Sequence, residues 1–527
     1  KVGRGIWPLS LHLPRPQIQA IPPSIAMLFS FLILALTATA QECPNYVQYA
    51  AERHEPFSPG IYEFPFQRPT KDCRTYSVDK VEEIIEGKNA TISDPDLQRL
   101  FENTWPSTLD TTVRWTGVAK DNPDEELAFI ITGDINAMWM RDSANQLQSY
   151  KSIAGEDRIA SLYRGAINLQ ARYMTQFPYC NAFQPPPESG MSPQYEHDDD
   201  VVTPAVDHNV VFECKYEIDS MAAFFQLSWD YYEVTKDAEF FGKFGWAEAV
   251  KVILSTARDL MRGTYADDGS VIRPPYTWLR TATSASETVF NKGTGAPVRG
   301  NIGLVRSFFR PSDDSCIYQY FIPGNIMFSR YVKATSEIMK TIDEALAKEM
   351  EDIADGIAKG IEEHAIVNHP EFGEVYAFEI DGFGSFNLMD DANIPSLLSI
   401  PHLGFKESTD SIYQNTRNFV LSKSNPYFAY GPVINATGGP HVGPGNGWPM
   451  AVVMQLLTSD DDEEITQGLK ELLGSTSNLG LMHETVNSHD DSQWTRPWFA
   501  WANGLFGQMI LDLEKRKPHL LEQNFQG

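Results

Sequence analysis

The 527-residue chain is 42% hydrophobic and carries 11 Trp, 21 Tyr and 30 Phe, enough for a large core in one big domain or in two to three ordinary ones. Its net charge of −28 creates a field that repels phosphate, which argues against nucleic acid or an anionic membrane surface as a partner. So many aromatic rings fit either a large core or a sugar-binding cleft.

The first predicted element is a targeting segment. Residues 25–36, IAMLFSFLILAL, form an apolar run that is too short to span a bilayer comfortably, and an A-x-A signal-peptidase site follows at residues 38–40. We expect residues 1–40 to be a signal peptide, or a leader followed by a signal if Met27 is the true start. The mature chain is then secreted or in the secretory pathway, without stable membrane association; an uncleaved anchor in the Golgi is the alternative.

The cysteines fit an oxidising compartment. None of the five is part of a CxxC pair, so the sequence does not predict a structural zinc. Cys43–Cys73 and Cys180–Cys214 are candidate disulfides, which would leave Cys316 free.

Two sequons, at Asn89 and Asn435, fit N-glycosylation in the same compartment. No sequence feature specifies an oligomer, and we expect a monomer by default.

Helical periodicity dominates the chain after a loop-like stretch over 41–77. The predicted helices span 77–87, 94–104, 139–154, 157–176, 219–235, 236–243, 246–263, 323–347, 349–365, 393–400, 408–422, 448–458, 461–474 and 498–515. Brief strand candidates lie at 111–117, 127–132 and 375–379.

The order of these elements predicts an all-α toroid. A dozen or so helices in succession can pair into two shells, with alternate loops gathered into a pocket at one end. The loops are long and rich in Gly, Pro, Asp and aromatic residues, and long loops in a compact domain are usually functional. No repeat or linker divides residues 41–527, so we expect a single catalytic domain.

Several common cofactor and metal motifs are missing. The chain has no GxxxxGK[ST] loop and no GxSxG elbow, and GPGNGW at 443–448 lacks dinucleotide-binding spacing. In HETVNSH at 483–489 the two histidines are six residues apart, unlike those of a zinc-binding HExxH helix, and DDANIP at 390–395 lacks the glycine of an EF-hand loop. We therefore expect no cofactor and no metal.

Carboxylates among aromatic residues and arginines remain as candidates for chemistry. Hydrolysis of a glycosidic bond requires two carboxyl groups, one held protonated and one ionised. Asp219 begins the helix over 219–235 beside an apolar face, where desolvation raises a carboxyl pKa. The alternative is that Asp219 simply caps the helix, and Glu217 is a competing acid.

The partner carboxylate should come from another loop. Glu484 precedes a polar cluster that contains Trp494 and Arg496; a solvated loop carboxylate is the alternative, and Asp490 and Asp491 are rivals for the same role.

Other polar and aromatic residues can be interpreted either as part of a pocket or as structural residues. Arg141 and Asp142 can line a pocket or form a structural ion pair, and Asp313 and Asp314 are read more readily as helix caps. For each of Trp139, Trp448, Trp494 and Trp498 core packing is the simpler explanation, although we expect at least one at the pocket.

Five long segments resemble a known family. They are LFENTWPSTLDTTV (100–113), TGDINAMWMRDSANQLQSY, KYEIDSMAAFFQLSWDYY, FRPSDDSCIYQYFIPGNIMF and MHETVNSHDDSQWTRPWFAWANGLFGQMI. In order, and from about residue 80 to 515, they resemble glycoside hydrolase family 125, the metal-independent exo-α-1,6-mannosidases of bacteria and fungi. The resemblance implies an (α/α)6 barrel, which agrees with the helical pattern, and inverting removal of a terminal mannose.

The resemblance also assigns roles to residues. It implies that Asp219 of YEIDSM is the general acid and Glu484 of MHET the general base. The substrate-binding residues it implies are Asp134, Arg141 and Asp142, with His483, Arg496, Trp139 and Asn446 as weaker candidates.

The expected partner is a mannose-containing oligosaccharide or glycan. One alternative is another helical-barrel carbohydrate hydrolase, such as an α-glucosidase. The other is a mannan-binding protein without turnover, against which the intact Asp219 and Glu484 argue.

Overall fold

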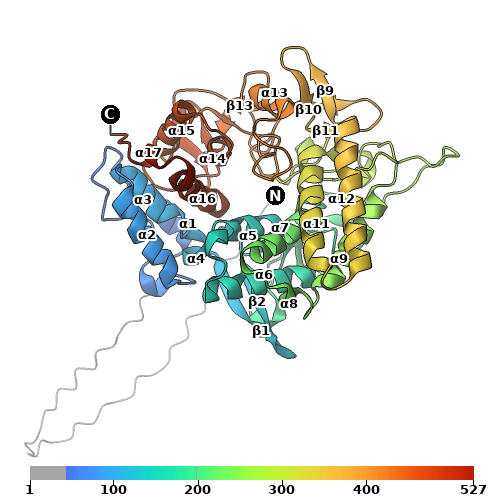
Figure 1. The fold of residues 1–527 in the computed structure, drawn as a ribbon, viewed down its shortest axis with the longest axis horizontal. Coiled ribbons are helices and arrows are strands. Elements are labelled where there is room, and N and C mark those ends of the chain that lie inside the picture. Colours follow the sequence, from blue (N-terminus) through green and yellow to red (C-terminus); the bar gives the residue numbers. More distant parts are fainter. Residues whose placement is uncertain (1–42, 197–198, 527) are drawn as a thin grey trace, which may run out of the picture. The chain divides into compact units, whose positions relative to one another are not determined.

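The computed structural model describes residues 43–196 and 199–526, and Pro44–Gly527 forms one compact unit (Figure 1). The predicted signal segment over 1–40 lies outside the described residues. Within the described part of the chain, no helix is long and apolar enough to cross a membrane.

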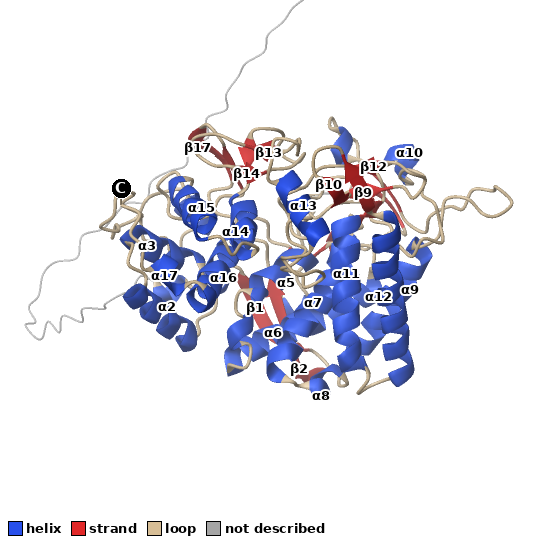
Figure 2. Cartoon of the chain, turned by 45° about the horizontal axis from the view of Figure 1, so that its top comes forward, coloured by secondary structure: helices blue, strands red, loops and turns tan. Residues whose placement is uncertain are grey.

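Helices are the main regular secondary structure of this unit (Figure 2). The α-helices are α1 (Tyr46–Ala50), α2 (Asp79–Thr91), α3 (Pro95–Thr104), α4 (Ser107–Thr111), α5 (Met140–Gln148), α6 (Asp157–Gln176), α7 (Ile218–Thr235), α8 (Ala238–Phe241), α9 (Trp246–Leu260), α10 (Phe290–Gly293), α11 (Ile322–Met339), α12 (Glu344–His364), α13 (Ser411–Val420), α14 (Pro449–Leu457), α15 (Asp462–Gly474), α16 (Ala500–Arg516) and α17 (Pro518–Leu521). Short 3-10 turns lie at Lys71–Cys73, Lys151–Ile153, Pro187–Ser189 and Ala285–Glu287.

The helices pack in two layers. Helices α14, α16, α5, α7 and α11 lie side by side in that order, and α15, α3, α6 and α12 pack on α14, α16, α7 and α11 respectively. Helix α16, near the end of the chain, thus contacts α3 near its beginning, as the red and blue ribbons of Figure 1 show. This arrangement agrees with the predicted two shells; the closed (α/α)6 barrel stays a prediction.

Sequence composition explains which helices lie inside. Helix α7 buries residues all round its circumference, from Ile218 to Tyr232, as a helix enclosed on every side must. Helix α12 buries only a stripe at three- and four-residue spacing, which includes Leu346, Met350 and Ile357, and its other face is polar. The apolar pattern therefore places α7 in the inner layer and α12 in the outer one.

The strands are short and form small antiparallel sheets. They are β1 (Val113–Ala119), β2 (Asn122–Ile130), β3 (Met138–Trp139), β4 (Ala182–Phe183), β5 (Val201–Thr203), β6 (Val211–Glu213), β7 (Thr277–Leu279), β8 (Tyr320–Phe321), β9 (Ile366–His369), β10 (Gly373–Tyr376), β11 (Glu379–Ile380), β12 (Phe386–Asn387), β13 (Phe428–Ala429), β14 (Ala436–Thr437), β15 (Asn446–Gly447), β16 (Thr485–Asn487) and β17 (Asp490–Thr495).

Two of these sheets position residues of the candidate site. In β3–β4–β6, Trp139 pairs with Ala182 and Ala182 pairs with Glu213. In β15–β16–β17, Thr485 pairs with Thr495, which places Glu484 next to Arg496. Each sheet thus joins loop segments that are far apart in the sequence.

The predicted helix over 393–400 is wrong, because that segment forms turns. The carboxylate of Asp390 accepts hydrogen bonds from the backbone N–H groups of Leu397 (2.8 Å) and Leu398 (3.0 Å), so these groups have a side-chain partner instead of a helical one. Pro395 has no backbone N–H to contribute to a helix. The predicted strand over 375–379 is two separate strands, β10 and β11.

The predicted Cys180–Cys214 disulfide is confirmed, and Cys316 is free and buried. The pairing of Cys43 with Cys73 stays a prediction. The Cys180–Cys214 bridge closes a segment of 34 residues beside Asn181 and Lys215, both of which belong to the site described below.

Replacing both Cys180 and Cys214 with Ala should lower the free energy of unfolding by roughly 2–4 kcal/mol, because the unfolded chain regains the entropy that the bridge removes. Urea unfolding of the oxidised protein and of the double variant measures this difference. Wild-type protein with reductant serves as the control and should unfold near the midpoint of the variant. Equal midpoints for the oxidised protein and the variant would contradict the prediction.

Candidate active site

One cavity combines acidic, basic and aromatic side chains. The lining comes from loop segments that lie far apart in the sequence, and from the residues that precede or begin α5, α14 and α16. The lining residues are Thr132, Ile135, Trp139, Arg141, Asp142, Pro311, Ser312, Asp313, Asn393, His441, Trp448, Glu484, Arg496, Phe499 and Trp501.

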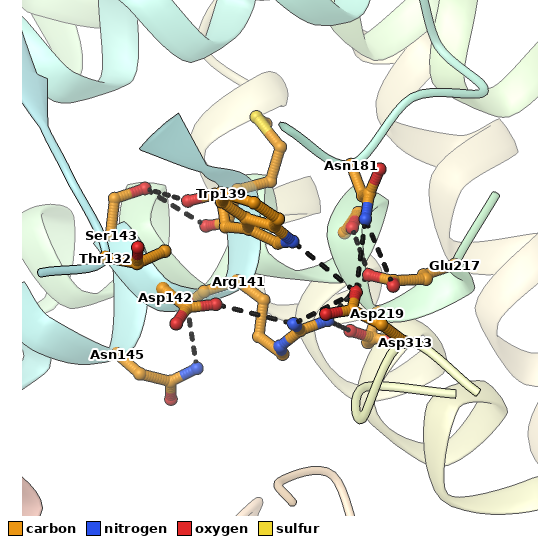
Figure 3. A network of polar contacts seen from close by, with 12 residues as sticks. Thr132, Trp139, Arg141, Asp142, Ser143, Asn145, Asn181, Glu217, Asp219 and Asp313 are labelled. Carbon is orange, nitrogen blue, oxygen red and sulfur yellow. Dashed lines mark hydrogen bonds and ion pairs between the residues drawn. The ribbon is translucent and has the colours of Figure 1, made fainter. Parts of the chain in front are cut away.

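Arg141, in the first turn of α5, lines the cavity. Figure 3 shows it among the carboxyl groups of Asp142, Glu217, Asp219 and Asp313. Its Nη1 lies 2.6 Å from Oε2 of Glu217 and 3.1 Å from Oδ2 of Asp219, and its Nη2 lies 3.4 Å from Asp142 and 3.9 Å from Asp313. A single guanidinium therefore faces four carboxyl groups. This buried surplus of acid favours retention of protons on some of them.

Burial raises the pKa of three of these carboxyl groups. It raises the pKa of Asp142 to about 6 and that of Asp219 to about 6, although Arg141 opposes both shifts. It raises the pKa of Glu217 well above its ordinary value, again against Arg141, while Asp313 and Asp219 add to the increase. Burial therefore favours the protonated form of Glu217.

Asp313 projects from a turn at the edge of this cluster. Its φ of 67° lies in the left-handed region, which a residue other than glycine adopts at some cost. The donors nearest to Oδ1 of Asp313 are Nε1 of Trp139 at 3.4 Å and Nδ2 of Asn181 at 3.3 Å. The Asp313 side chain is 26% exposed, whereas those of Glu217 and Asp219 are 0% exposed. Within the cluster, Asp313 and Asp142 line the cavity, and Asp313 is the more accessible of the two.

Glu484 lines the cavity from a different loop. Its backbone N–H donates to Thr495 at 3.2 Å, and its Oε1 lies 3.1 Å from Nε of Arg496. The φ of Arg496 is 55°, so a second residue with left-handed backbone faces the same cavity. Arg496 thus holds the Glu484 carboxylate beside the cavity.

His441 adds a cationic group. Its Nδ1 lies 3.6 Å from Oδ2 of Asp314. Burial lowers its pKa, but the nearby carboxylate of Asp314, together with the charges of Glu484 and Asp313, raises it to about 9 overall. His441 therefore carries a positive charge at neutral pH and can donate hydrogen bonds into the cavity.

Aromatic rings supply the apolar walls. Trp139, Trp448, Phe499 and Trp501 line the cavity beside these charged groups. Flat apolar faces next to carboxylates and guanidinium groups suit a ligand that has both C–H patches and hydroxyl groups, as a sugar ring does. Across residues 43–196 and 199–526, no group of three or more His, Cys, Asp and Glu side chains is placed to hold a metal ion.

Comparison with known proteins gives a consistent result. The sequence pattern of GH125, described as metal-independent alpha-mannosidase, matches residues 94–511. The chain belongs to glycoside hydrolase family 125. Its sequence is 48% identical over 486 residues to the Meiotically up-regulated gene 157 protein of Schizosaccharomyces pombe, covering 92% of this chain and 94% of that protein.

A solved family 125 structure has the same fold. It is a metal-independent α-mannosidase of Streptococcus pneumoniae in a non-productive substrate complex with α-1,6-mannobiose. The two chains are 31% identical with a TM-score of 0.74, and the match covers 83% of this chain and 99% of that one.

Five of the nine site residues predicted for this family 125 protein line the cavity. They are Trp139, Arg141, Asp142, Glu484 and Arg496. Among the four tryptophans considered, Trp139 and Trp448 line the cavity. Trp494 instead stacks on His483, and Trp498 packs against Tyr46.

Asp219 is not among the lining residues. It is fully buried on α7 behind Arg141, its Oδ2 lies 3.1 Å from that guanidinium, and its Oδ1 has no hydrogen-bond partner. Glu217, the competing acid, is equally buried. The catalytic role expected of Asp219 stays an untested prediction that its position does not favour.

Three further predicted binding residues also lie away from the lining. Asp134 is exposed and forms an ion pair with Arg496. Asn446 donates to the carbonyl of Val442 at 3.1 Å. His483 is buried with its ring nitrogens 3.0 and 3.1 Å from the carbonyls of Arg496 and Thr476, and burial lowers its pKa to about 4. These contacts support loops of the site, and direct binding of substrate by the three residues stays a prediction.

The sequence pattern does not predict every residue that lines the cavity. The helix-cap reading of Asp313 is wrong, because the next helix after it, α11, begins only at Ile322. His441 and Asn393 carry no local signal beyond their place in Gly- and Pro-rich loops. Asp313 did have one signal, an Asp-Asp pair in a loop between an arginine and a cysteine, but sequence could not tell which of the two acids faces the cavity.

Proposed function

We propose that this protein is an exo-acting α-1,6-mannosidase that inverts the anomeric configuration, with Asp313 as general acid and Glu484 as general base. The observation that carries the proposal is that these two carboxyl groups, from loops 171 positions apart in the sequence, line the same aromatic-walled cavity in a family 125 protein. Asp313 replaces Asp219 in this role because Asp219 does not reach the cavity.

The proposed reaction uses the two carboxyl groups on opposite sides of the sugar. Asp313 donates a proton to the glycosidic oxygen as its bond to the anomeric carbon breaks. Glu484 accepts a proton from the water that attacks the anomeric carbon from the other face. Arg496 holds Glu484 in place, and Arg141 and Asp142 supply hydrogen bonds to sugar hydroxyls.

The linkage is proposed from the pneumococcal relative, whose structure contains α-1,6-mannobiose. A mannose-containing oligosaccharide or glycan is therefore the proposed substrate class of this chain.

The secretory pathway or the cell exterior is the proposed location. It is supported by the Cys180–Cys214 disulfide, since such bonds persist mainly in oxidising compartments.

Incubation with α-1,6-mannobiose should release mannose, and the rate should not change with EDTA, because the proposed chemistry uses only carboxyl groups. NMR spectroscopy of the first product should show β-mannose, as inversion of an α-linkage requires. Isomaltose, cleaved in place of mannobiose, would favour the α-glucosidase alternative. Binding of mannobiose without cleavage would favour a mannan-binding protein, and loss of activity in EDTA would reveal a metal requirement.

A further inference from the structure

A cluster of acidic side chains behind Asp313 is not used by the mechanism above. Three acids lie within reach of Arg141, Asn181 or Lys215. They are Glu217, just before α7, Asp219 in the first turn of α7, and Glu213 at the end of β6. Glu213 is balanced by Lys215 at 3.2 Å and by Arg280 at 3.0 Å. The excess of negative charge therefore lies around Arg141. Its single guanidinium group is shared by four carboxyl groups, those of Asp142, Glu217, Asp219 and Asp313.

The side-chain amide of Asn181 is the donor around which these carboxyl groups gather. Its Oδ1 accepts the backbone N–H of Lys215 at 2.9 Å, which identifies Nδ2 as the amide donor. Nδ2 lies 3.3 Å from each of three carboxylate oxygens, those of Glu213, Glu217 and Asp313. An amide group has only two hydrogens, so at least one of them is shared between two of these oxygens. Three carboxyl groups crowded around one donor repel one another, and a proton held between two of them relieves this repulsion.

The contacts of Glu217 indicate where that proton lies. Its Oε2 accepts from Nη1 of Arg141 at 2.6 Å and from Oγ of Ser220 at 3.1 Å, so Oε2 is the acceptor oxygen of the carboxyl group. The other oxygen, Oε1, lies 3.3 Å from Nδ2 of Asn181, and Oδ1 of Asp313 lies 3.3 Å from the same nitrogen, so the Glu217 and Asp313 carboxyl groups meet at one amide donor. Two carboxyl groups can form a hydrogen bond only if one of them is protonated.

We propose, building on the function assigned above, that Glu217 and Asp313 share one proton, and that Glu217 is the positioning residue that keeps Asp313 supplied with the proton it transfers to the leaving sugar. Glu217 does not touch the substrate, because it is fully buried and does not line the cavity.

The transfer balances in protons and charge. The proton passes from Glu217 to Asp313 and from Asp313 to the glycosidic oxygen, whose bond to the anomeric carbon breaks. Glu217 is then a carboxylate, stabilised by Arg141 at 2.6 Å, and Asp313 is a carboxylate near Lys215 and Arg141. After the product leaves, a solvent proton re-enters the pair through Asp313, its more exposed member.

Charged neighbours explain why Asp313 needs this partner. Burial raises the pKa of Asp313, but Lys215, Arg141 and the hydrogen bond with Glu217 lower it overall, so Asp313 by itself is ionised at neutral pH. The pair as a unit retains a proton because burial and the neighbouring Asp219 raise the pKa of Glu217. Loss of that proton as the pH rises removes the acid and lowers kcat/KM. The fall in kcat/KM at high pH therefore measures the pKa at which the Glu217–Asp313 pair loses its proton.

The variant Glu217→Gln cannot share a proton with Asp313. We expect its high-pH limb to move at least about one unit to lower pH, and kcat/KM for α-1,6-mannobiose at pH 7 to fall by about tenfold or more. α-Mannosyl fluoride, whose leaving group needs little protonation, should lose less than about threefold. Activity on mannobiose should recover as the pH is lowered.

Asp219→Asn is the matched control. It removes a carboxyl group two residues along the chain, with the same full burial and the same guanidinium partner, but not the one that meets Asp313 at Asn181. The high-pH limb of the kcat/KM profile of Asp219→Asn should shift by less than half of the shift in Glu217→Gln. Three results would overturn the proposal. In the first, the high-pH limb shifts equally in the two variants, and in the second it does not shift in Glu217→Gln. In the third, Glu217→Gln loses kcat/KM equally on mannobiose and mannosyl fluoride at every pH.

Infrared spectroscopy tests the shared proton without any assay of activity. Wild-type protein at pH 8 should show the carbonyl band of a protonated carboxyl group, and the band should be lost in Glu217→Gln and kept in Asp219→Asn. Absence of the band from the wild type overturns the proposal even if the variant does not fold. A wild type that shows the band but hydrolyses neither substrate would refute the proposed function and leave the shared proton established.

Discussion

Replacement of Asp313 with Asn should reduce kcat/KM for α-1,6-mannobiose by about 10²–10⁴-fold, the usual contribution of general acid catalysis. Hydrolysis of α-mannosyl fluoride should fall by less than about tenfold, because fluoride departs with little help from an acid. Asn is close to Asp in size and can still accept hydrogen bonds from Trp139 and Asn181, so the loss reports the missing proton.

Asp219→Asn distinguishes the two assignments of the acid. Asp219 has no access to the cavity and contacts Arg141, so its loss should disturb the position of that guanidinium and reduce hydrolysis of both substrates by similar factors. Steady-state kinetics measures, for each variant, the loss of kcat/KM on α-1,6-mannobiose relative to the loss on α-mannosyl fluoride. If Asp219→Asn, and not Asp313→Asn, selectively loses mannobiose hydrolysis, then Asp219 is the acid and the cavity must open further when substrate binds.

Replacement of Glu484 with Gln should abolish turnover of both substrates to a similar extent, by about 10²–10⁴-fold. The attacking water must be activated whatever the leaving group is. Hydrolysis of α-mannosyl fluoride should therefore fall as much as hydrolysis of mannobiose. Gln keeps the size of the side chain beside Arg496, and binding of mannobiose should therefore persist.

The control for this variant is Asp490→Asn, since Asp490 was the rival base. Its carboxylate accepts hydrogen bonds from Ser492 and Gln493 on β17 and is not among the cavity-lining residues. Activity within about twofold of wild type is expected, as for most surface substitutions. Calorimetric titration with mannobiose checks that Glu484→Gln still binds. Full activity of Glu484→Gln, with loss in Asp490→Asn, would reverse the assignment.

Helix positions were largely predictable because the apolar spacing is local. The spacing over 157–176 and 461–474 predicts α6 and α15 almost to the residue. The segment 393–400 shows the limit of such reasoning. Its apolar residues are buried, yet Asp390 and Pro395 impose turns, since side-chain capping of backbone N–H groups competes with a helix.

The candidate site was only partly predictable. Glu484, Arg141, Asp142, Trp139 and Arg496 were found as polar or aromatic residues in loops, and all five line the cavity. Choosing among Glu217, Asp219 and Asp313 was beyond sequence reasoning, because all three sit in acidic motifs of similar appearance.

The sequence by itself determined the family, the helical class and the set of carboxyl groups available for chemistry, because these follow from composition, periodicity and motif order. Only the tertiary structure decided which acid meets the cavity. Accessibility and proton sharing depend on neighbours contributed by α5, α7, β6 and the turn at Asp313, and no local pattern specifies how far a buried side chain lies from open space.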